Sequence, residues 1–321
     1  MNPAEMHIGV DIGKDKLDVC LPNGHKYVTT NNKKGIKPII KDAKKLNAIV
    51  SFEATGIYSN KLYDACIAAG VRAMQLDPWR ARNFAKSQGL LEKTDSIDCE
   101  MIRDFAASLK PEKRRFIEPI SDSQRNLRTT VRVRRNLMKA KNLVATQLDC
   151  IDDASSRKSL MRIVDRLEAE IAKVEAHSDE IIANDERMHA LAVRFLVVAG
   201  VGPCVTRVIL SDVPEIGRLT NKAIGKILGL APLENKSCTV EKKSRPQRGR
   251  GYARSVLYEA TMTACRFNHV WKQDYDDMVA RGKPKPVAHT AIARKMAILL
   301  NTIAKYPGFK PSEPPKPAKA K

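Results

Sequence analysis

Short runs of hydrophobic residues, many of them β-branched, alternate with amphipathic stretches along the first 110 residues. Five such runs predict strands, over 6–13, 16–24, 25–31, 47–56 and 71–78. The first two flank a tight turn and the third can continue them into a meander, whereas a helical stretch to Gly70 separates the last two. This order predicts a mixed α/β domain in which a hairpin meander precedes β-α-β units.

The pattern changes over 111–190, where Gly is absent, Pro is confined to positions 111 and 119, and charged residues dominate. One helix is indicated by apolar residues spaced four and three apart, at Leu160, Val164, Leu167, Ile171 and Val174. The helix before it is strongly basic, with Arg125, Arg128, Arg132, Arg134, Arg135, Lys139 and Lys141. We expect an antiparallel helical pair or coiled coil that forms a dimer and whose first arm contacts phosphate. A solvated helix face is the alternative for any single arginine.

Gly and Pro return after residue 190. A Gly-rich turn, "GVGP" at 200–203, opens a helix, and two amphipathic helices are predicted over 252–267 and 287–305. Before these two helices lies the basic segment "KKSRPQRGRGYAR" (242–254), which is typical of a phosphate-contact loop. The expected organisation is an α/β domain over 1–115, a helical segment over 116–190, a mainly helical domain over 191–305 and a disordered Pro/Lys-rich tail over 306–321.

The composition narrows the range of functions that fit this chain. The formal net charge of +21 indicates a polyanionic partner, foremost nucleic acid, and the 5% of aromatic residues argues against base-stacking platforms. No apolar run approaches the length of a membrane span, and the N-terminus lacks a signal-peptide pattern. The seven cysteines form no C-x-x-C pair, so we expect buried thiols in a reducing cytoplasm rather than disulfides or zinc.

Four carboxylates could carry chemistry. Asp11 and Glu53 each end an apolar strand, where a buried charge needs a cation or hydrogen-bond donors. Asp95 and Asp98 stand three apart at a predicted helix start, on one helix face. If the four converge, they offer the oxygen ligands of a two-magnesium phosphoryl-transfer site. The alternative for the aspartates is a helix cap.

Asp15 and Asp18 also lie close to Asp11 in the sequence. We expect these two aspartates to be solvated on the hairpin.

The motifs "VDIGK" (10–14), "FEATG" (52–56) and "KTDSID" (93–98), in this order, resemble the RuvC-like domain of DEDD-type transposases of bacterial insertion sequences, the bridge-RNA-guided recombinases with a C-terminal serine domain. The second half of the chain is similar to that family too. The matching motifs there are "GVGP", "GLAPLENKS" (229–237), "GRGYARSVLYEA" (249–260) and "ARKMAILLN" (293–301). The resemblance implies a RuvC-like fold of the RNase H type for the N-terminal domain.

The resemblance makes Asp11, Glu53, Asp95 and Asp98 the magnesium ligands and Ser237 the nucleophile, which in the family attacks a DNA phosphate and holds the broken strand covalently. The family usually has Gly after this serine, where this chain has Cys238; Ser244 is a second serine nearby. Phosphate contacts are expected from Arg125, Arg128, Arg132, Lys242, Lys243, Arg245, Arg248, Arg250 and Arg254. The implied partners are target and donor double-stranded DNA, a structured bridge RNA, and further copies of the chain, from dimer to tetramer. The implied location is the bacterial cytoplasm, at the nucleoid.

Three functions remain open from the sequence: an RNA-directed, Mg²⁺-dependent recombinase with a phosphoserine intermediate; a hydrolytic junction-resolving nuclease that uses water with the same carboxylates; and a non-catalytic nucleic-acid-binding protein. Ser237 separates the first two functions, because only the recombinase requires a serine nucleophile.

Overall fold

The computed structural model describes residues 5–54, 56–89, 95–114, 116–231, 235–237, 240–242 and 249–310, and for 95–98, 235–237 and 240–242 it describes the secondary structure alone. The chain divides into two compact units, Met1–Pro119 and Ile120–Lys321, here called unit 1 and unit 2. No helix among these residues is long and apolar enough to cross a membrane.

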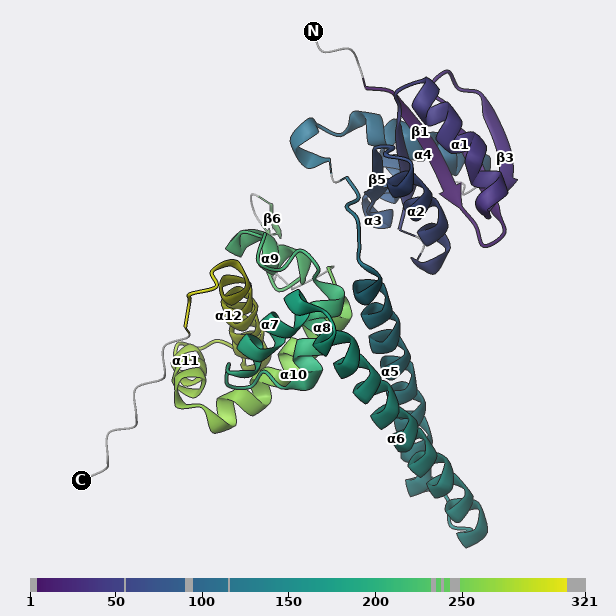
Figure 1. The fold of residues 1–321 in the computed structure, drawn as a ribbon. Coiled ribbons are helices and arrows are strands. Elements are labelled where there is room, and N and C mark those ends of the chain that lie inside the picture. Colours follow the sequence, from purple (N-terminus) through teal and green to yellow (C-terminus); the bar gives the residue numbers. More distant parts are fainter. Residues whose placement is uncertain are drawn as a thin grey trace, which may run out of the picture. The chain divides into compact units, whose positions relative to one another are not determined.

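Unit 1 is built on a five-stranded mixed sheet (Figure 1). Its strands are β1 (His7–Ile12), β2 (Lys16–Cys20), β3 (Lys26–Thr30), β4 (Ile49–Glu53) and β5 (Ala73–Leu76). Its helices are α1 (Lys33–Lys45), α2 (Asn60–Ala68), α3 (Pro78–Ser87) and α4 (Asp95–Ser108), with 3₁₀ turns at Gly56–Ser59 and Pro111–Lys113.

The strand order β3-β2-β1-β4-β5 follows from the connections. Short turns join β1, β2 and β3 as antiparallel neighbours, whereas α1 and α2 lie in the crossovers that make β4 and β5 parallel to β1. The predicted meander followed by β-α-β units is confirmed.

Helices cover both faces of this sheet. Alternate residues of β1 and β4, such as Ile8, Val10 and Phe52, pack with α1 and α2 on one face. The other residues of β4 face the opposite side, where Ile49 packs with Met101 and Phe105 of α4. Each face therefore has its own apolar core.

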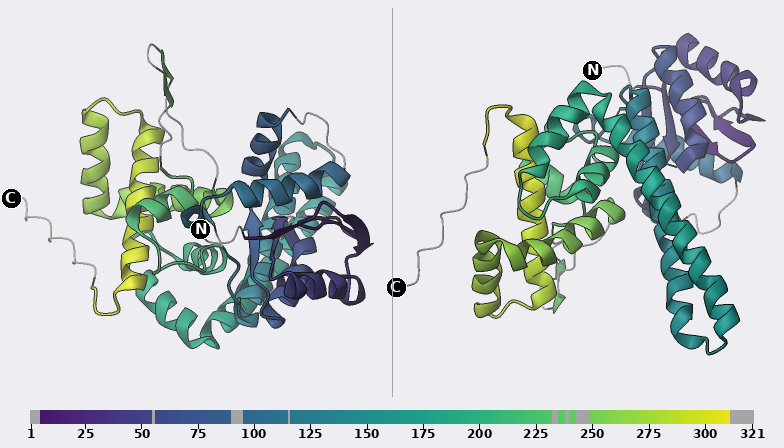
Figure 2. Two further views of the ribbon diagram at one scale, coloured as in Figure 1. Left: turned by 90° about the horizontal axis from the view of Figure 1, so that it is seen from above. Right: turned by 60° about the horizontal axis from the view of Figure 1, so that its bottom comes forward.

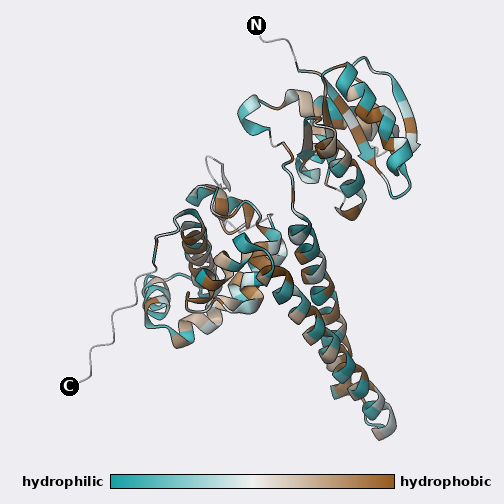
Figure 3. Ribbon diagram, in the orientation of Figure 1, coloured by the Kyte–Doolittle hydropathy of each residue, from teal (hydrophilic) through white to brown (hydrophobic). Residues whose placement is uncertain are grey.

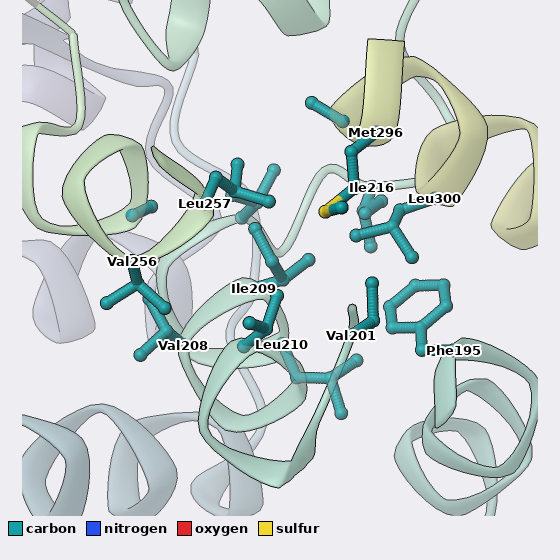
Figure 4. Close-up of a cluster of buried hydrophobic side chains, with 14 of the residues drawn as sticks. Phe195, Val201, Val208, Ile209, Leu210, Ile216, Val256, Leu257, Met296 and Leu300 are labelled. Carbon is teal, nitrogen blue, oxygen red and sulfur yellow. The ribbon is translucent and has the colours of Figure 1, made fainter. Parts of the chain in front are cut away.

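Unit 2 is mainly helical. Its elements are α5 (Asp122–Gln147), a 3₁₀ turn (Leu148–Cys150), α6 (Ala154–Ala183), α7 (Glu186–Leu196), α8 (Pro203–Asp212), α9 (Asn221–Ile227), the short strands β6 (Asn235–Ser237) and β7 (Val240–Lys242), α10 (Gly251–Phe267), α11 (His269–Ala280) and α12 (Lys285–Lys305). The core joins α7, α8, α10 and α12, with Phe195, Ile209 and Leu300 among its fully buried side chains (Figure 4).

α5 and α6 lie side by side as a helical hairpin (Figures 1 and 2). Of the predicted apolar seam on α6, Ile171 is buried, whereas Leu160, Val164, Leu167 and Val174 are half-buried. Gln124, near the start of α5, donates hydrogen bonds to the Leu210 and Ser211 carbonyls of α8. The hairpin is thus attached at its α5 end to the helices that follow it, within one unit.

One expectation about the cysteines is wrong in part. Cys20, Cys66, Cys99 and Cys265 are buried and Cys204 is half-buried, but Cys150, in the turn between α5 and α6, is exposed. Cys238 lies outside the described residues.

Candidate functional site

Asp11 and Glu53 lie at the same edge of the unit 1 sheet. β1 and β4 pair in parallel from His7↔Ile49 to Val10↔Phe52, so Asp11 and Glu53 are the next residues of the two strands. Their side chains share the face of His7 and Ser51, which are joined by a contact of 3.2 Å between His7 Nδ1 and Ser51 Oγ. Adjacent strands stand about 4.8 Å apart, so the two half-buried carboxylates are neighbours.

α4 crosses the sheet on this same face. Gly9 permits the crossing, because a Cβ atom there would stand 2.0 Å from the Cys99 carbonyl oxygen and 2.6 Å from the Arg103 nitrogen. Arg103 reaches Cys20 Sγ at 3.0 Å, and Cys20 pairs with Gly9. Its contact with the Leu21 carbonyl, at 3.4 Å, lies still further from Asp11 along the sheet. The helix therefore begins on the Asp11 side and runs away from it.

The N-terminal turn of α4 is thereby brought toward Asp11. Asp95 begins α4 and precedes Cys99 by about 6 Å of helix, while Asp11 follows Gly9 by about 7 Å of strand. The side chains of Asp95 and Asp98 lie outside the described residues. Among the side chains that are described, no group of three or more metal-ligating residues is found.

Asp18 corrects an expectation. It is 7% exposed rather than solvated, and it pairs directly with Asp11 across β1 and β2, so both carboxylates share one face. Lys16 forms an ion pair with Asp18 at 3.2 Å. Asp15 is exposed, as expected. The hairpin register could have identified Asp18, because a two-residue turn at 14–15, flanked by the hydrogen-bonded Gly13 and Lys16, places 11 opposite 18.

The carboxylates at this edge supply the type of oxygen ligand that a hard divalent cation prefers, although the described ones do not form a metal-binding group by themselves. Asp11, Glu53 and Asp18 come from three adjacent strands and offer carboxylate oxygens on one face. Like charges held directly opposite each other on neighbouring strands repel, so the arrangement is favourable when a cation is shared. The ammonium group of Lys16, paired with Asp18, supplies one positive charge at this edge of the sheet.

Ser237 ends the short strand β6 in unit 2, and its side chain lies outside the described residues. β6 pairs with β7 in register Ser237↔Val240, which makes a hairpin. The base of the hairpin is well defined. Before it, Leu230 and Ala231 donate backbone hydrogen bonds of 2.8 and 3.1 Å to the Gly225 carbonyl of α9, and after it Arg250 donates one of 2.9 Å to the Ile227 carbonyl.

Gly249 permits this close return of the chain. Its φ of +75° is in the left-handed region, and a Cβ atom would stand 2.5 Å from the Gly229 nitrogen and the Ile227 carbonyl oxygen. Both ends of the segment 232–248 are therefore held at the C-terminal end of α9.

An ion pair also stabilises the base of the β6–β7 hairpin. Arg250 binds Glu215 through two hydrogen bonds of 2.7 Å each. Burial raises the pKa of Glu215, but the hydrogen bond and charge of Arg250 outweigh it, so this pKa lies below its ordinary value. Burial raises the pKa of the neighbouring Asp212. Sequence reasoning missed Glu215, which no motif marks.

The predicted phosphate contacts differ in their surroundings. Arg132 is exposed, Arg125 and Arg254 are half-buried, Arg128 donates a hydrogen bond of 3.0 Å to the Ser211 carbonyl, and Arg250 is engaged by Glu215. Lys242, Lys243, Arg245 and Arg248 have side chains outside the described residues. Among the predicted phosphate contacts whose side chains are described, Arg132 is the exposed one.

Two family models match the chain. Residues 8–151 match the transposase model DEDD_Tnp_IS110, and residues 193–276 match the model "Transposase IS116/IS110/IS902 family". No curated protein matches. Among solved structures, "T. thermophilus RuvC in complex with Holliday junction substrate" is 12% identical with a TM-score of 0.28, over 35% of this chain and 99% of that chain. A TM-score this low carries no argument about fold or function.

The first match takes in the Asp11 and Glu53 edge of the sheet, and the second takes in the base of the Ser237 hairpin. These matches show that the chain carries domains of the transposase class. More particularly, the chain carries the two domains of the IS110 family of transposases.

Proposed function

We propose that this protein is an insertion-sequence recombinase that cleaves and rejoins DNA strands through a covalent phosphoserine intermediate. The observation that carries the proposal is the placement of Asp11 and Glu53 on one sheet edge, on the face where α4 begins, in a chain with both transposase domains. The start of α4 supplies Asp95 and Asp98, so the predicted tetrad comes from two strands and one helix.

The carboxylates would hold Mg²⁺. Asp11 and Glu53, with Asp95 and Asp98, are the ligands we assign, and Asp18 borders them. When bound, the metal supplies positive charge that polarises a DNA phosphate and stabilises the charge that develops there. The carboxylates themselves fix where on the sheet edge that phosphate is held.

Ser237 supplies the nucleophile in this proposal. Its Oγ forms a bond to the DNA phosphorus, and the bond from that phosphorus to a deoxyribose oxygen breaks. The serine proton is given up and the released deoxyribose oxygen takes up a proton, so the step is balanced. Rejoining is the reverse attack by a deoxyribose hydroxyl. Basic neighbours, Lys242, Lys243, Arg245 and Arg248, would hold the backbone of the strand.

The decisive experiment is capture of a denaturation-resistant protein–DNA adduct. We expect the wild-type chain to form the adduct with Mg²⁺, and Ser237→Ala to form none. Ser244→Ala is the matched control and should retain the adduct, and Cys238→Ser tests the residue that follows Ser237 in the sequence. An adduct that survives Ser237→Ala would overturn the assignment of the nucleophile.

The same variants test the alternative functions. A Ser237→Ala chain that still cuts DNA with Mg²⁺ would identify a hydrolytic nuclease with water as nucleophile. Asp11→Asn and Glu53→Gln should each abolish both the adduct and cutting, because each removes a charged oxygen ligand. Absence of metal-dependent cutting or adduct in the wild-type chain would favour the non-catalytic DNA-binding protein.

Guidance by a structured bridge RNA belongs to the proposal through the resemblance of the motifs and is compatible with the charge of +21. We expect an RNA encoded beside the gene, with loops matching the element ends and the insertion site. Adduct formation on a matched duplex should require that RNA. Equal adduct yield without it would remove RNA guidance from the proposal while leaving the phosphoserine chemistry intact.

A dimer or tetramer is proposed to form through the α5–α6 hairpin as a coiled coil. Leu143 of α5 is 65% exposed, and Met161 and Ile163 of α6 are about half exposed, so apolar surface remains on the hairpin. Hydrophobic positions recur along both of its helices in Figure 3. We expect Leu143→Asp with Met161→Asp to lower the sedimentation coefficient toward that of the monomer. An unchanged coefficient would place the association elsewhere.

A further inference from the structure

α1 carries a concentration of positive charge that the proposed site does not use. Within its thirteen residues six lysines are exposed, Lys33, Lys34, Lys37, Lys41, Lys44 and Lys45. None of the six forms an ion pair with any side chain that the structure describes. The single acid of the helix, Asp42, accepts a hydrogen bond of 3.0 Å from the Tyr27 hydroxyl.

The lysines form one continuous face. At 100° per residue they occupy about a third of the helix circumference, and Ile36, Ile39 and Ala43, which are buried against the sheet, lie opposite them. The helix is about 18 Å long, so the charges are spread along a line rather than gathered at one point. Hydrophilic positions recur along α1 in Figure 3. We call this surface the α1 lysine face.

Apart from Lys44 and Lys45, whose charges in the last turn are favourable to the helix dipole, this face does not help the helix to form. Like charges four residues apart, such as Lys33, Lys37 and Lys41, repel, and Pro38 removes one backbone donor inside the helix. The packing of the apolar side and the Asn32 cap, whose side chain accepts a hydrogen bond of 2.9 Å from the Gly35 nitrogen, account for its stability. The lysines therefore indicate a ligand rather than a structural role.

The chemistry of the face selects phosphate. Lysine is a hydrated point charge that lacks the rigid planar fork of arginine, and α1 contains no aromatic, arginine or glutamine side chain. About 18 Å of duplex carries on the order of ten phosphates, so several can meet the face at once. A linear polyanion fits this arrangement better than a small anion does.

The location separates this face from the candidate active site. α1 packs on the sheet face formed by Ile8, Val10 and Phe52, whereas Asp11 and Glu53 project from the opposite face. We propose that the α1 lysine face binds the phosphate backbone of a nucleic-acid duplex at a place distinct from the strand that reaches the carboxylates.

The experiment measures duplex affinity of the full chain as a function of salt, without cleavage, in the Asp11→Asn background. The variant Lys37→Gln/Lys41→Gln/Lys44→Gln removes three charges from the face. Its matched control, Lys86→Gln/Lys110→Gln/Lys113→Gln, removes three exposed lysines elsewhere in unit 1. Each lost phosphate contact should reduce the slope of log K against log salt by about 0.9 with B-DNA, so we expect a reduction of about 2 to 3 for the face variant alone.

The experiment has two arms, one with duplex DNA and one with duplex RNA of the same sequence. Weakened binding of DNA alone, of RNA alone or of both identifies which backbone the face holds, and each supports the proposal. Equal losses in the face variant and its control, or no loss in either arm, would overturn it. The adduct rate at saturating DNA is also measured for the face variant with Asp11 intact. A lower rate without a change in affinity would overturn the separation of the face from the active site. Failure of the phosphoserine proposal would leave these binding results unaffected.

Discussion

The two basic helices of this protein, α1 in unit 1 and α5 in unit 2, use their charges in opposite ways. The lysines of α1 are all exposed and form no ion pair with a described residue. On α5, Arg134 forms an ion pair with Glu175, Lys141 contacts Glu168 at 3.1 Å, and the Arg135 guanidinium lies 4.6 Å from the centre of the Tyr252 ring. Most of the cations on α5 therefore attach it to neighbouring helices.

This difference shows why a count of basic residues does not locate a binding surface. α5 is the more arginine-rich helix, and arginine combines a lasting charge with directional hydrogen bonds that suit partly buried ion pairs. Lysine on α1 keeps a hydrated, mobile ammonium group available to an external anion. Arg132 and Lys139 are the exceptions on α5, because both are exposed and no contact to a described residue is found for either. Four predictions test the division, from the largest expected effect to the smallest.

The ion-pair network beneath α5 should matter most for stability. Arg207 of α8 is 7% exposed and binds Asp179 of α6 through hydrogen bonds of 2.7 and 2.6 Å, and it lies 3.4 Å from Glu175. Arg207→Met should lower the free energy of unfolding by about 2 kcal/mol, below the value for a fully buried pair because the Asp179 carboxylate reaches solvent. Urea unfolding measures this, with exposed Arg266→Met as the control. A change under 0.5 kcal/mol, expected for a surface site, would contradict it.

Arg134→Gln should have an intermediate effect on stability and none on DNA binding. The substitution removes a half-buried cation from Glu175, which keeps Arg207 as a partner, so the expected loss is about 1 kcal/mol. The salt dependence of duplex affinity should be unchanged. A smaller salt slope would show that this arginine binds phosphate as well as Glu175.

Arg132→Gln should show the reverse pattern. Arg132 is exposed, so we expect stability within about 0.5 kcal/mol of wild type and a salt slope smaller in magnitude by about 1. Arg132→Lys, which keeps the charge, should restore the slope. If Arg132→Gln leaves the slope unchanged, α5 contributes no phosphate contact here.

Lys37→Gln should have the smallest effect, and it should be stabilising. Removing one of the like charges four residues apart on α1 relieves a repulsion of about 0.2 to 0.5 kcal/mol. Thermal unfolding at low salt measures the gain, which should disappear at high salt because screening removes the repulsion. A destabilised variant would mean that Lys37 has a structural partner.

Much of unit 1 could be predicted from the sequence. The short apolar runs gave the strands in the right order. The runs that carry Asp11 and Glu53 are the first and the fourth, and they pair in parallel because β2, β3 and the crossover helix α1 lie between them. The helical segments of unit 2 followed from amphipathic spacing over 252–267 and 287–305, close to the observed Gly251–Phe267 and Lys285–Lys305.

The rest depended on pairings between distant residues. Asp18 is buried because the hairpin register sets it beside Asp11, and residue type alone suggests a solvated acid. The Arg250–Glu215 pair joins residues far apart in sequence, and no local pattern reveals it. The sequence shows lysines of α1 spaced four and three residues apart. Only burial and ion pairing in the structure distinguish them from the basic residues of α5.

The closed base of the Ser237 hairpin has a consequence for how this protein can vary. The residues that flank 232–248 meet at α9, where Gly225 accepts backbone hydrogen bonds from Leu230 and Ala231 and Ile227 accepts one from Arg250. Adding residues between these two attachment points costs loop-closure entropy that grows slowly, about 0.6 kcal/mol for each doubling of length. Segments of different length and sequence can be exchanged at this position while the same scaffold is retained.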